Sequence, residues 1–216
     1  MSSQVPEFLW ADEDDLQYDR AAGRTEPRSA IPGLPAEPGL WVFVLGDMTV
    51  FGWFFLVFMW ERRHDRAVFA DSVNKLYQPI GVVNTLVLLL GSFLVVLALQ
   101  ANRQGRPARC RRFLVGAASC GGAFATLKAV EYSLEISSGH TPGENAFFVF
   151  YFALTGIHLL HVLIGTALLF SWSRRVRRGR EWIRDRAFAE SAAVYWHMVD
   201  LLWIVIFTLI YLVSQS

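Results

Sequence analysis

The sequence has little cysteine, and its two cysteines follow none of the patterns that bind metals or cross-link secreted domains. Cys110 lies beside an arginine cluster, and Cys120 lies inside an apolar block. This arrangement excludes a disulfide framework and a CxxC metal site. We expect a loop thiol at Cys110 and a small packing residue at Cys120.

Proline is absent from the long apolar parts of the chain. Five of the eight prolines fall in an acidic leader that contains ADEDD and IPGLPAEPG. The other three, Pro79, Pro107 and Pro142, fall between apolar blocks, where helices break. We expect no cleavable signal peptide, because the first apolar block begins only behind this leader. Residues 1–38 are predicted to form a disordered, acidic and proline-rich cytoplasmic tail.

Long apolar blocks dominate the rest of the chain, and 54% of all residues are hydrophobic. Five blocks have roughly the 20 residues that a helix needs to cross a bilayer. They span residues 40–60, 80–99, 113–134, 146–172 and 192–213. Lys128 and Glu131 interrupt the third block, but they share one helix face and could neutralise each other. The sequence therefore predicts an all-α, multi-pass membrane protein with a five-helix transmembrane domain over residues 39–216.

Basic residues are absent from one loop and concentrated in two others. QANRQGRPARCRR carries five and SRRVRRGREWIRDRA carries seven, whereas residues 135–145 carry none. Cytoplasmic loops are the basic ones, so we expect a cytoplasmic amino terminus and an external carboxyl terminus. The first loop carries four basic residues and argues mildly against this orientation. The formal net charge is only +1, and we expect no nucleic-acid partner.

Small residues recur in the apolar blocks. GAASCGGA occupies residues 116–123, and Gly156 and Gly165 lie in the fourth block. Helices in lipid associate through such residues, because lipid and leucine are equally apolar. We expect a tight bundle or a contact surface for another membrane subunit.

Ionisable side chains lie deep inside four of the blocks, besides Lys128. They are Asp47, Glu131, His158, His161, His197 and Asp200. A charge within the membrane is costly, so each of these residues is expected to have a functional or a pairing role.

Metal or haem binding is one chemistry that these residues could serve. His158 and His161 share one helix face and His197 could join them, with Glu131 or Glu190 as a carboxylate ligand. However, the paired Glu-x-x-His motifs of di-iron bundles are absent.

Proton transfer and simple packing are the two alternatives. Asp47, Asp200 and the histidines could relay protons, although no block is broken by proline and no transporter-like repeat occurs. Equally, the polar groups could satisfy one another and make the bundle rigid. His197 and Asp200 stand three residues apart, as such a pair requires. Spacing alone favours the packing role.

The motifs in these blocks resemble subunit III of the haem-copper respiratory oxidases. TGIHLLHVLIG is similar to that family's TGxHxxHVxxG motif, and AVYWHMVDLLW is similar to its closing YWHFVDxxW helix. KAVEYSLEISSG matches its EY element, and VNTLVLLLGS matches its NT…SS/SG helix. The resemblance runs from about Pro38 to Val213. GENAFFVFYFALTGIHLLHV is most similar to the NorE-like, nitric-oxide-reductase-associated branch.

Two departures from the family pattern stand out. The mitochondrial form has two further helices at its amino end, and the family's lipid-holding cleft lies between those helices and the rest. The resemblance therefore leaves a phospholipid partner open. In addition, Asp47 in GDMTVF stands where the family usually has glutamate in an S/G-E-x-x-F setting.

The resemblance implies an accessory role. Subunit III of the family packs on subunit I and supports proton uptake and sustained turnover, while haem and copper belong to subunits I and II. We therefore expect no catalytic residue, metal or cofactor in this chain, and we expect subunits I and II as partners in a bacterial plasma membrane. The complex would reduce oxygen or nitric oxide with electrons from cytochrome c or quinol. The alternative is an independent haem- or metal-binding membrane protein or a proton-coupled transporter.

The resemblance and the predicted depths suggest how the polar residues are arranged. We expect His161, His197 and Asp200 to form one buried hydrogen-bonded network, because lipid tolerates no unpaired polar group. Asp47 is expected to face subunit I or a cytoplasmic proton entrance, and Glu131 is expected near the outer surface.

Overall fold

The computed structural model describes residues 38–76, 78–141, 143–177 and 182–212. In these ranges the chain folds into six α-helices and one π-helical turn, and no strand occurs there. The elements are α2 (Pro38–His64), α3 (Arg66–Lys75), α4 (Gln78–Arg103), α5 (Pro107–Ser137), α6 (Ala146–Arg177), α7 (Trp182–Phe207) and η2 (Thr208–Leu212). The predicted disordered tail lies outside the described residues, apart from Pro38, which begins α2.

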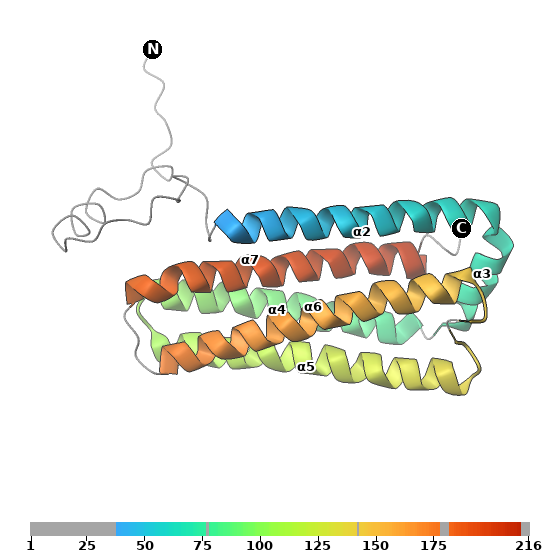
Figure 1. Ribbon diagram of the computed structural model, residues 1–216. Helices are drawn as coiled ribbons and strands as arrows, with labels where there is room; N and C mark the ends of the chain where they lie inside the picture. Colours follow the sequence, from blue (N-terminus) through green and yellow to red (C-terminus); the bar gives the residue numbers. More distant parts are fainter. Residues whose placement is uncertain (1–37, 77, 142, 178–181, 213–216) are drawn as a thin grey trace, which may run out of the picture.

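Five of the helices are long and apolar enough to cross a membrane, which confirms the predicted fold class. The spans are Gly39–His64, Pro79–Arg103, Pro107–Ser137, Ala146–Arg177 and Ala187–Tyr211. Figure 1 shows these helices side by side and running alternately in opposite directions. One end of the bundle holds the α4–α5 connection, the end of α6 and the start of α7, and the other holds α3, the end of α5 and the start of α6.

Two of the prolines mark helix starts, as the sequence indicated. Pro79 is the second residue of α4, and Pro107 is the first residue of α5, where a missing N–H costs nothing. The turn before Pro107 is tight, with Gly105 at φ 63°, a backbone conformation that favours glycine. Pro142 lies outside the described residues.

The short helix α3 was not predicted. It lies at the end of the bundle between α2 and α4 and buries Phe69 and Val73. The ring of Phe69 packs edge-on against Phe58 of α2 and Phe147 of α6. The spacing of Phe69, Val73 and Leu76 is that of one helical face, and it was the available signal.

Helix α7 runs through the middle of the bundle, and its Trp196 shows how the helices approach each other. A Cβ on Gly91 of α4 would lie 3.2 Å from the indole, one on Gly121 of α5 would lie 3.0 Å from it, and one on Gly165 of α6 would lie 3.1 Å from it. Three glycines from three helices therefore make room for one side chain, which is how membrane helices pack closely.

The small-residue stretch 116–123 serves mainly these internal contacts. Gly116 packs against Leu94, and Cys120 packs against Gly91, so α4 and α5 lie close together along this seam. Gly122, in contrast, faces open space. Cys110, expected as a loop thiol, is instead buried in the first turns of α5, because that helix begins earlier than the apolar block.

Candidate functional site

Polar side chains inside the bundle gather at three contacts between helices. The α2–α6 pair consists of Asp47 and His161. The α4–α7 cluster consists of Ser92, His197 and Asp200. The lysine cluster, formed by α5, α6 and η2, consists of Lys128, Glu131, Tyr151 and Tyr211.

In the α2–α6 pair, His161 bridges a backbone carbonyl and a carboxylate. Its Nδ1 lies 2.8 Å from the carbonyl oxygen of Ile157, and its Nε2 lies 3.1 Å from Oδ1 of Asp47. Only 11% of the His161 side chain and 13% of the Asp47 side chain are exposed. The Phe51 ring packs edge-on against the imidazole and the Tyr195 hydroxyl donates to the His161 carbonyl, which fixes the geometry.

These contacts allow the two side chains to share one proton. A carbonyl oxygen only accepts, so Nδ1 of His161 must carry a proton. The contact between Nε2 and Asp47 then has two forms, either an imidazolium beside a carboxylate or a neutral imidazole beside a carboxylic acid. The two forms differ only in which atom holds the proton, and the 3.1 Å separation of Nε2 and Oδ1 suits either of them. The geometry therefore suits a group that holds and passes one proton.

The α4–α7 cluster is built on Ser92. Its Oγ lies 2.6 Å from Nδ1 of His197, and Asp200, one turn further along α7, lies close enough to interact electrostatically with both side chains. If the Ser92 hydroxyl donates to the Asp200 carboxylate, the Ser92 oxygen can accept a hydrogen bond from His197. The three side chains then form a single hydrogen-bonded chain. Asp200 is 7% exposed, so the cluster lies within the α4–α7 contact.

The predicted network of His161, His197 and Asp200 is therefore divided between two contacts. His161 faces α2, whereas His197 and Asp200 face α4. This division arises because α2 and α4 lie on different sides of the α6–α7 contact, which spacing along the chain could not show. Asp47 lies beside His161 with 13% of its side chain exposed, and its expected position facing subunit I or a proton entrance stays a prediction.

The lysine cluster is fully buried, and three donors converge on one oxygen. Lys128 Nζ lies 3.0 Å from Oε1 of Glu131, and the hydroxyls of Tyr151 and Tyr211 donate to the same oxygen at 2.6 and 2.5 Å. Lys128 also donates to both hydroxyls, at 3.4 and 3.3 Å. The expected pairing of Lys128 with Glu131 is thus confirmed, and the two tyrosines complete it.

Aromatic rings surround the ammonium of Lys128. It lies 4.8 Å from the ring centroid of Tyr151, 5.2 Å from that of Trp203 and 5.5 Å from that of Tyr132. Cations are attracted to the faces of such rings, most strongly where water is excluded. The rings and the carboxylate together offset the cost of a buried charge.

His158 differs from its neighbour His161. It is fully buried, and its ring packs against Phe124 and Trp203 with centroid distances of 5.5 and 5.1 Å. Neither ring nitrogen has a hydrogen-bond partner within the described parts of the chain, and the same is true of the side-chain amide of Asn84. The two histidines of the fourth block therefore have different surroundings, although they share a helix.

The residues considered as metal ligands lie apart. In the described ranges, no three side chains of histidine, cysteine, aspartate or glutamate come close enough to hold a metal ion. His161, His197 and Glu131 belong to three separate contacts, and Glu190 pairs with Arg103 at 3.5 Å.

Sequence reasoning missed Tyr151 and Tyr211 as members of a site. Tyrosine is common in membrane helices, and its position gave no sign of a shared carboxylate. Tyr211 reaches Glu131 from the π-helical turn η2, which changes the direction of side chains at the end of α7. The local signal was the phenol itself, because a buried hydroxyl needs a partner.

The fold and these contacts define a multi-pass membrane protein whose polar side chains are mostly paired across its helices. The chain matches the family described as cytochrome c oxidase subunit III over residues 33–215. It is 29% identical to cytochrome c oxidase subunit 3 of Thermostichus vulcanus, over 82% of this chain and 87% of that protein. It is 25% identical to the corresponding subunit of Bacillus sp. (strain PS3), over 94% and 98%. It is also 27% identical to cytochrome bo(3) ubiquinol oxidase subunit 3 of Buchnera aphidicola, over 81% and 84%.

The chain therefore belongs to the cytochrome c oxidase subunit III family. It is an accessory subunit III of a haem-copper oxidase, as the motifs around His161 and His197 indicated. Its five spanning helices and its bacterial relatives identify a multi-pass bacterial membrane protein that associates with other oxidase subunits.

Proposed function

We propose that this subunit supports proton uptake by the oxidase, and that the Asp47–His161 pair is the group that holds the proton. The pair has two protonation forms with the same geometry, and the exposed 13% of the Asp47 side chain gives it an opening at the bundle surface. A carboxyl group that is paired within the membrane and still accessible is typical of proton pathways. Aspartate in place of the family's usual glutamate suits this short contact with His161.

We further propose that subunit I packs on the exposed face of α5. That face carries a stripe of small residues, namely Ser119, Gly122, Thr126, Ala129 and Ser133. Each hydroxyl of the stripe donates to its own helix, at the carbonyls of Val115, Gly122 and Ala129. A stripe of this kind allows another membrane helix to approach closely. The exposed side of α2 carries Trp53 and Trp60 instead, at 70% and 65% exposure, which suits lipid.

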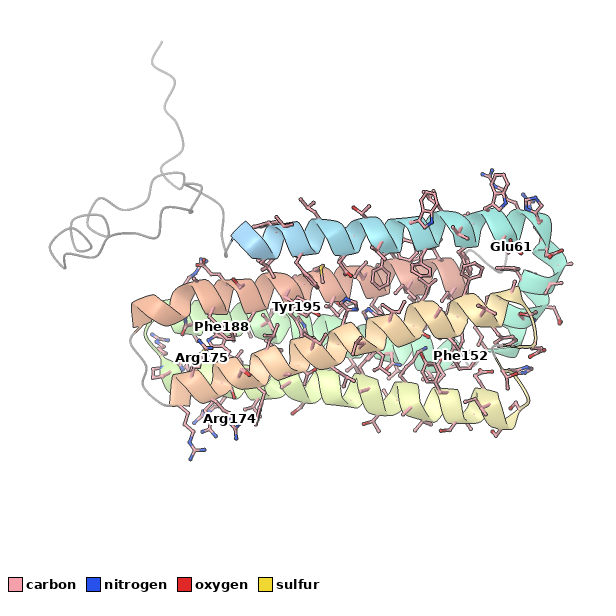
Figure 2. All side chains as sticks on the ribbon, in the orientation of Figure 1. Glu61, Phe152, Arg174, Arg175, Phe188 and Tyr195 are labelled. Atoms are coloured by element: carbon pink, nitrogen blue, oxygen red, sulfur yellow. The ribbon has the colours of Figure 1, made fainter. Side chains whose placement is uncertain are left out.

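We also propose an orientation of the subunit in the membrane. The end of the bundle with the α4–α5 and α6–α7 connections carries most of the arginines, and Figure 2 shows Arg174 and Arg175 there, opposite Glu61. The excess of basic residues favours the cytoplasm at this end. The amino terminus is then cytoplasmic and the carboxyl terminus external. From the sequence motifs we also propose subunit II as a partner and the NorE-like branch of the family.

The decisive experiment changes the proton-holding group and keeps its shape. In the assembled oxidase, Asp47→Asn should leave assembly intact and lower sustained turnover and proton uptake several-fold, because the amide cannot take up a proton. Asp65→Asn, an exposed carboxylate beside α3, is the matched control. Substrate reduction and proton uptake are measured in vesicles and normalised to the haem content of the complex. Unchanged turnover in fully assembled Asp47→Asn oxidase would show that the pair is only structural.

A further inference from the structure

A cavity of about 400 Å³ lies where α4 ends and α5 begins. Its lining is formed by Leu97, Gln100, Ala101, Gln104, Arg109, Arg112 and Phe113. A volume of this order falls in the range of small-molecule sites. Because α4 and α5 both span the membrane, the cavity lies at the level where lipid headgroups meet water. We refer to it as the α4–α5 pocket.

The lining of the α4–α5 pocket is polar at its mouth and apolar further in. Gln104 directly follows α4, whereas Leu97 lies seven residues earlier, or roughly 10 Å deeper at 1.5 Å per residue. On α5, Arg109 is in the first turn, and Phe113 lies about one turn deeper. This order fits an amphiphile whose head points toward water and whose apolar part points into the bilayer.

The pocket carries positive charge that nothing nearby on these helices offsets. The sequence has no acidic residue from Gln78 to Val130. Arg103 pairs with Glu190, but Arg109 and Arg112 form no ion pair within the described ranges. The first turn of α5 also lacks an acidic residue, so the positive end of the helix dipole adds to the same field. The pocket is therefore complementary to an anion.

We propose that the α4–α5 pocket binds the headgroup phosphate of an anionic phospholipid. The guanidinium groups of Arg109 and Arg112 can donate paired hydrogen bonds to phosphate oxygens, and the two glutamine amides can donate to the remaining ones. The acyl chains then follow the exposed apolar side chains of α4, among them Phe93 and Val96. Free phosphate can accept the same hydrogen bonds as the lipid headgroup, but it leaves the apolar side chains of Leu97 and Phe113 without a partner. The inference does not rest on the proposed proton role.

The test measures lipid retained by the full chain and by the assembled oxidase. Both are purified from nanodiscs that contain equal phosphatidylglycerol and phosphatidylcholine, and bound lipid is counted by native mass spectrometry. Arg109→Gln with Arg112→Gln should lower retained phosphatidylglycerol by about thirtyfold, since each arginine that hydrogen-bonds the phosphate contributes roughly fivefold. Arg106→Gln with Arg111→Gln removes equal charge from the same region outside the lining, and it should retain the lipid.

Two further arms and two comparisons make the result decisive. Leu97→Trp keeps both arginines but fills the apolar part of the pocket, so it should also release the lipid. Equal loss in the two double variants would overturn the proposal, because it would indicate a diffuse basic surface. Full displacement by millimolar inorganic phosphate would overturn it in favour of a free-anion site. Lipid bound to the isolated chain but absent from the assembled oxidase would overturn it in favour of a protein partner.

Discussion

Lys128 and Glu131 form an ion pair of 3.0 Å in which neither side chain has any exposed surface. The pair lies one turn apart on α5, and Tyr151 and Tyr211 bind both members from neighbouring elements. A charge buried in this way is tolerated only while its partner is present. Stability of the α5–α6–α7 contact therefore depends on both members together.

The ion pair can be tested by removing one or both charges. Glu131→Gln alone leaves an uncompensated Lys128 and should destabilise the bundle by about 3–5 kcal/mol. Lys128→Met combined with Glu131→Gln should recover a large part of that loss, because no charge remains buried. Unfolding by denaturant in detergent micelles, followed by circular dichroism, measures the difference. A double variant as unstable as the sum of the two single variants would contradict coupling between these residues.

The neighbouring glycines Gly121 and Gly122 should respond differently to the same substitution. Gly121→Leu places a side chain against Thr166 and Trp196, so it should destabilise the bundle by about 1–3 kcal/mol or more. Gly122→Leu meets open space, so the isolated chain should keep its stability. If subunit I packs on the small-residue stripe, Gly122→Leu should still lower the yield of assembled oxidase. Thermal unfolding of the chain and co-purification of subunit I separate these two effects.

Asp200 should act through its link to Ser92. Asp200→Leu removes the acceptor of the α4–α7 cluster and should lower assembly of the complex, at a cost of about 1–3 kcal/mol to the chain. Asp200→Asn keeps an acceptor oxygen for the Ser92 hydroxyl and should restore much of the loss. Yield of complex per unit of expressed chain is the readout. Equal yields from the Leu and Asn variants would show that hydrogen bonding to Ser92 contributes nothing.

The proposed orientation is tested with reporters fused after Ser216. An external carboxyl terminus should give activity with a reporter that works only outside the cytoplasm, and none with a cytoplasmic reporter. Truncation after Arg177 followed by the same fusions should reverse the result, because one span is removed. Activity of the cytoplasmic reporter fused after Ser216 would contradict the proposed orientation, because it would place the arginine-rich end of the bundle outside.

The sequence allowed prediction of the features that depend on local spacing. Apolar blocks long enough to span a bilayer marked all five helices, and the distance of one turn indicated that Lys128 would pair with Glu131. The partner of His161 could not be predicted in this way, because Asp47 lies on another helix and spacing carries no information about which helices meet. The motif match predicted the family and hence the accessory role.

Other features were missed for physical reasons that are specific to them. Helix α3 has only ten residues and little apolar surface, so its periodicity is too weak to predict a helix. The contact of Tyr211 with Glu131 depends on the π-helical turn at the end of α7, and no sequence pattern indicated that turn. The α4–α5 pocket depends on how the end of α4 and the start of α5 pack together, which composition does not describe.

The glycine contacts of Trp196 have a consequence for how the subunit is made. Residue 196 belongs to α7, which leaves the ribosome after α4, α5 and α6, and its indole occupies the space that Gly91, Gly121 and Gly165 leave between those three helices. Until α7 is inserted, those helices can be covered there only by lipid tails or by each other. Close packing of these helices is therefore completed only when α7 is inserted, so a nascent chain that stops after α6 presents an unfinished surface to membrane quality-control proteases.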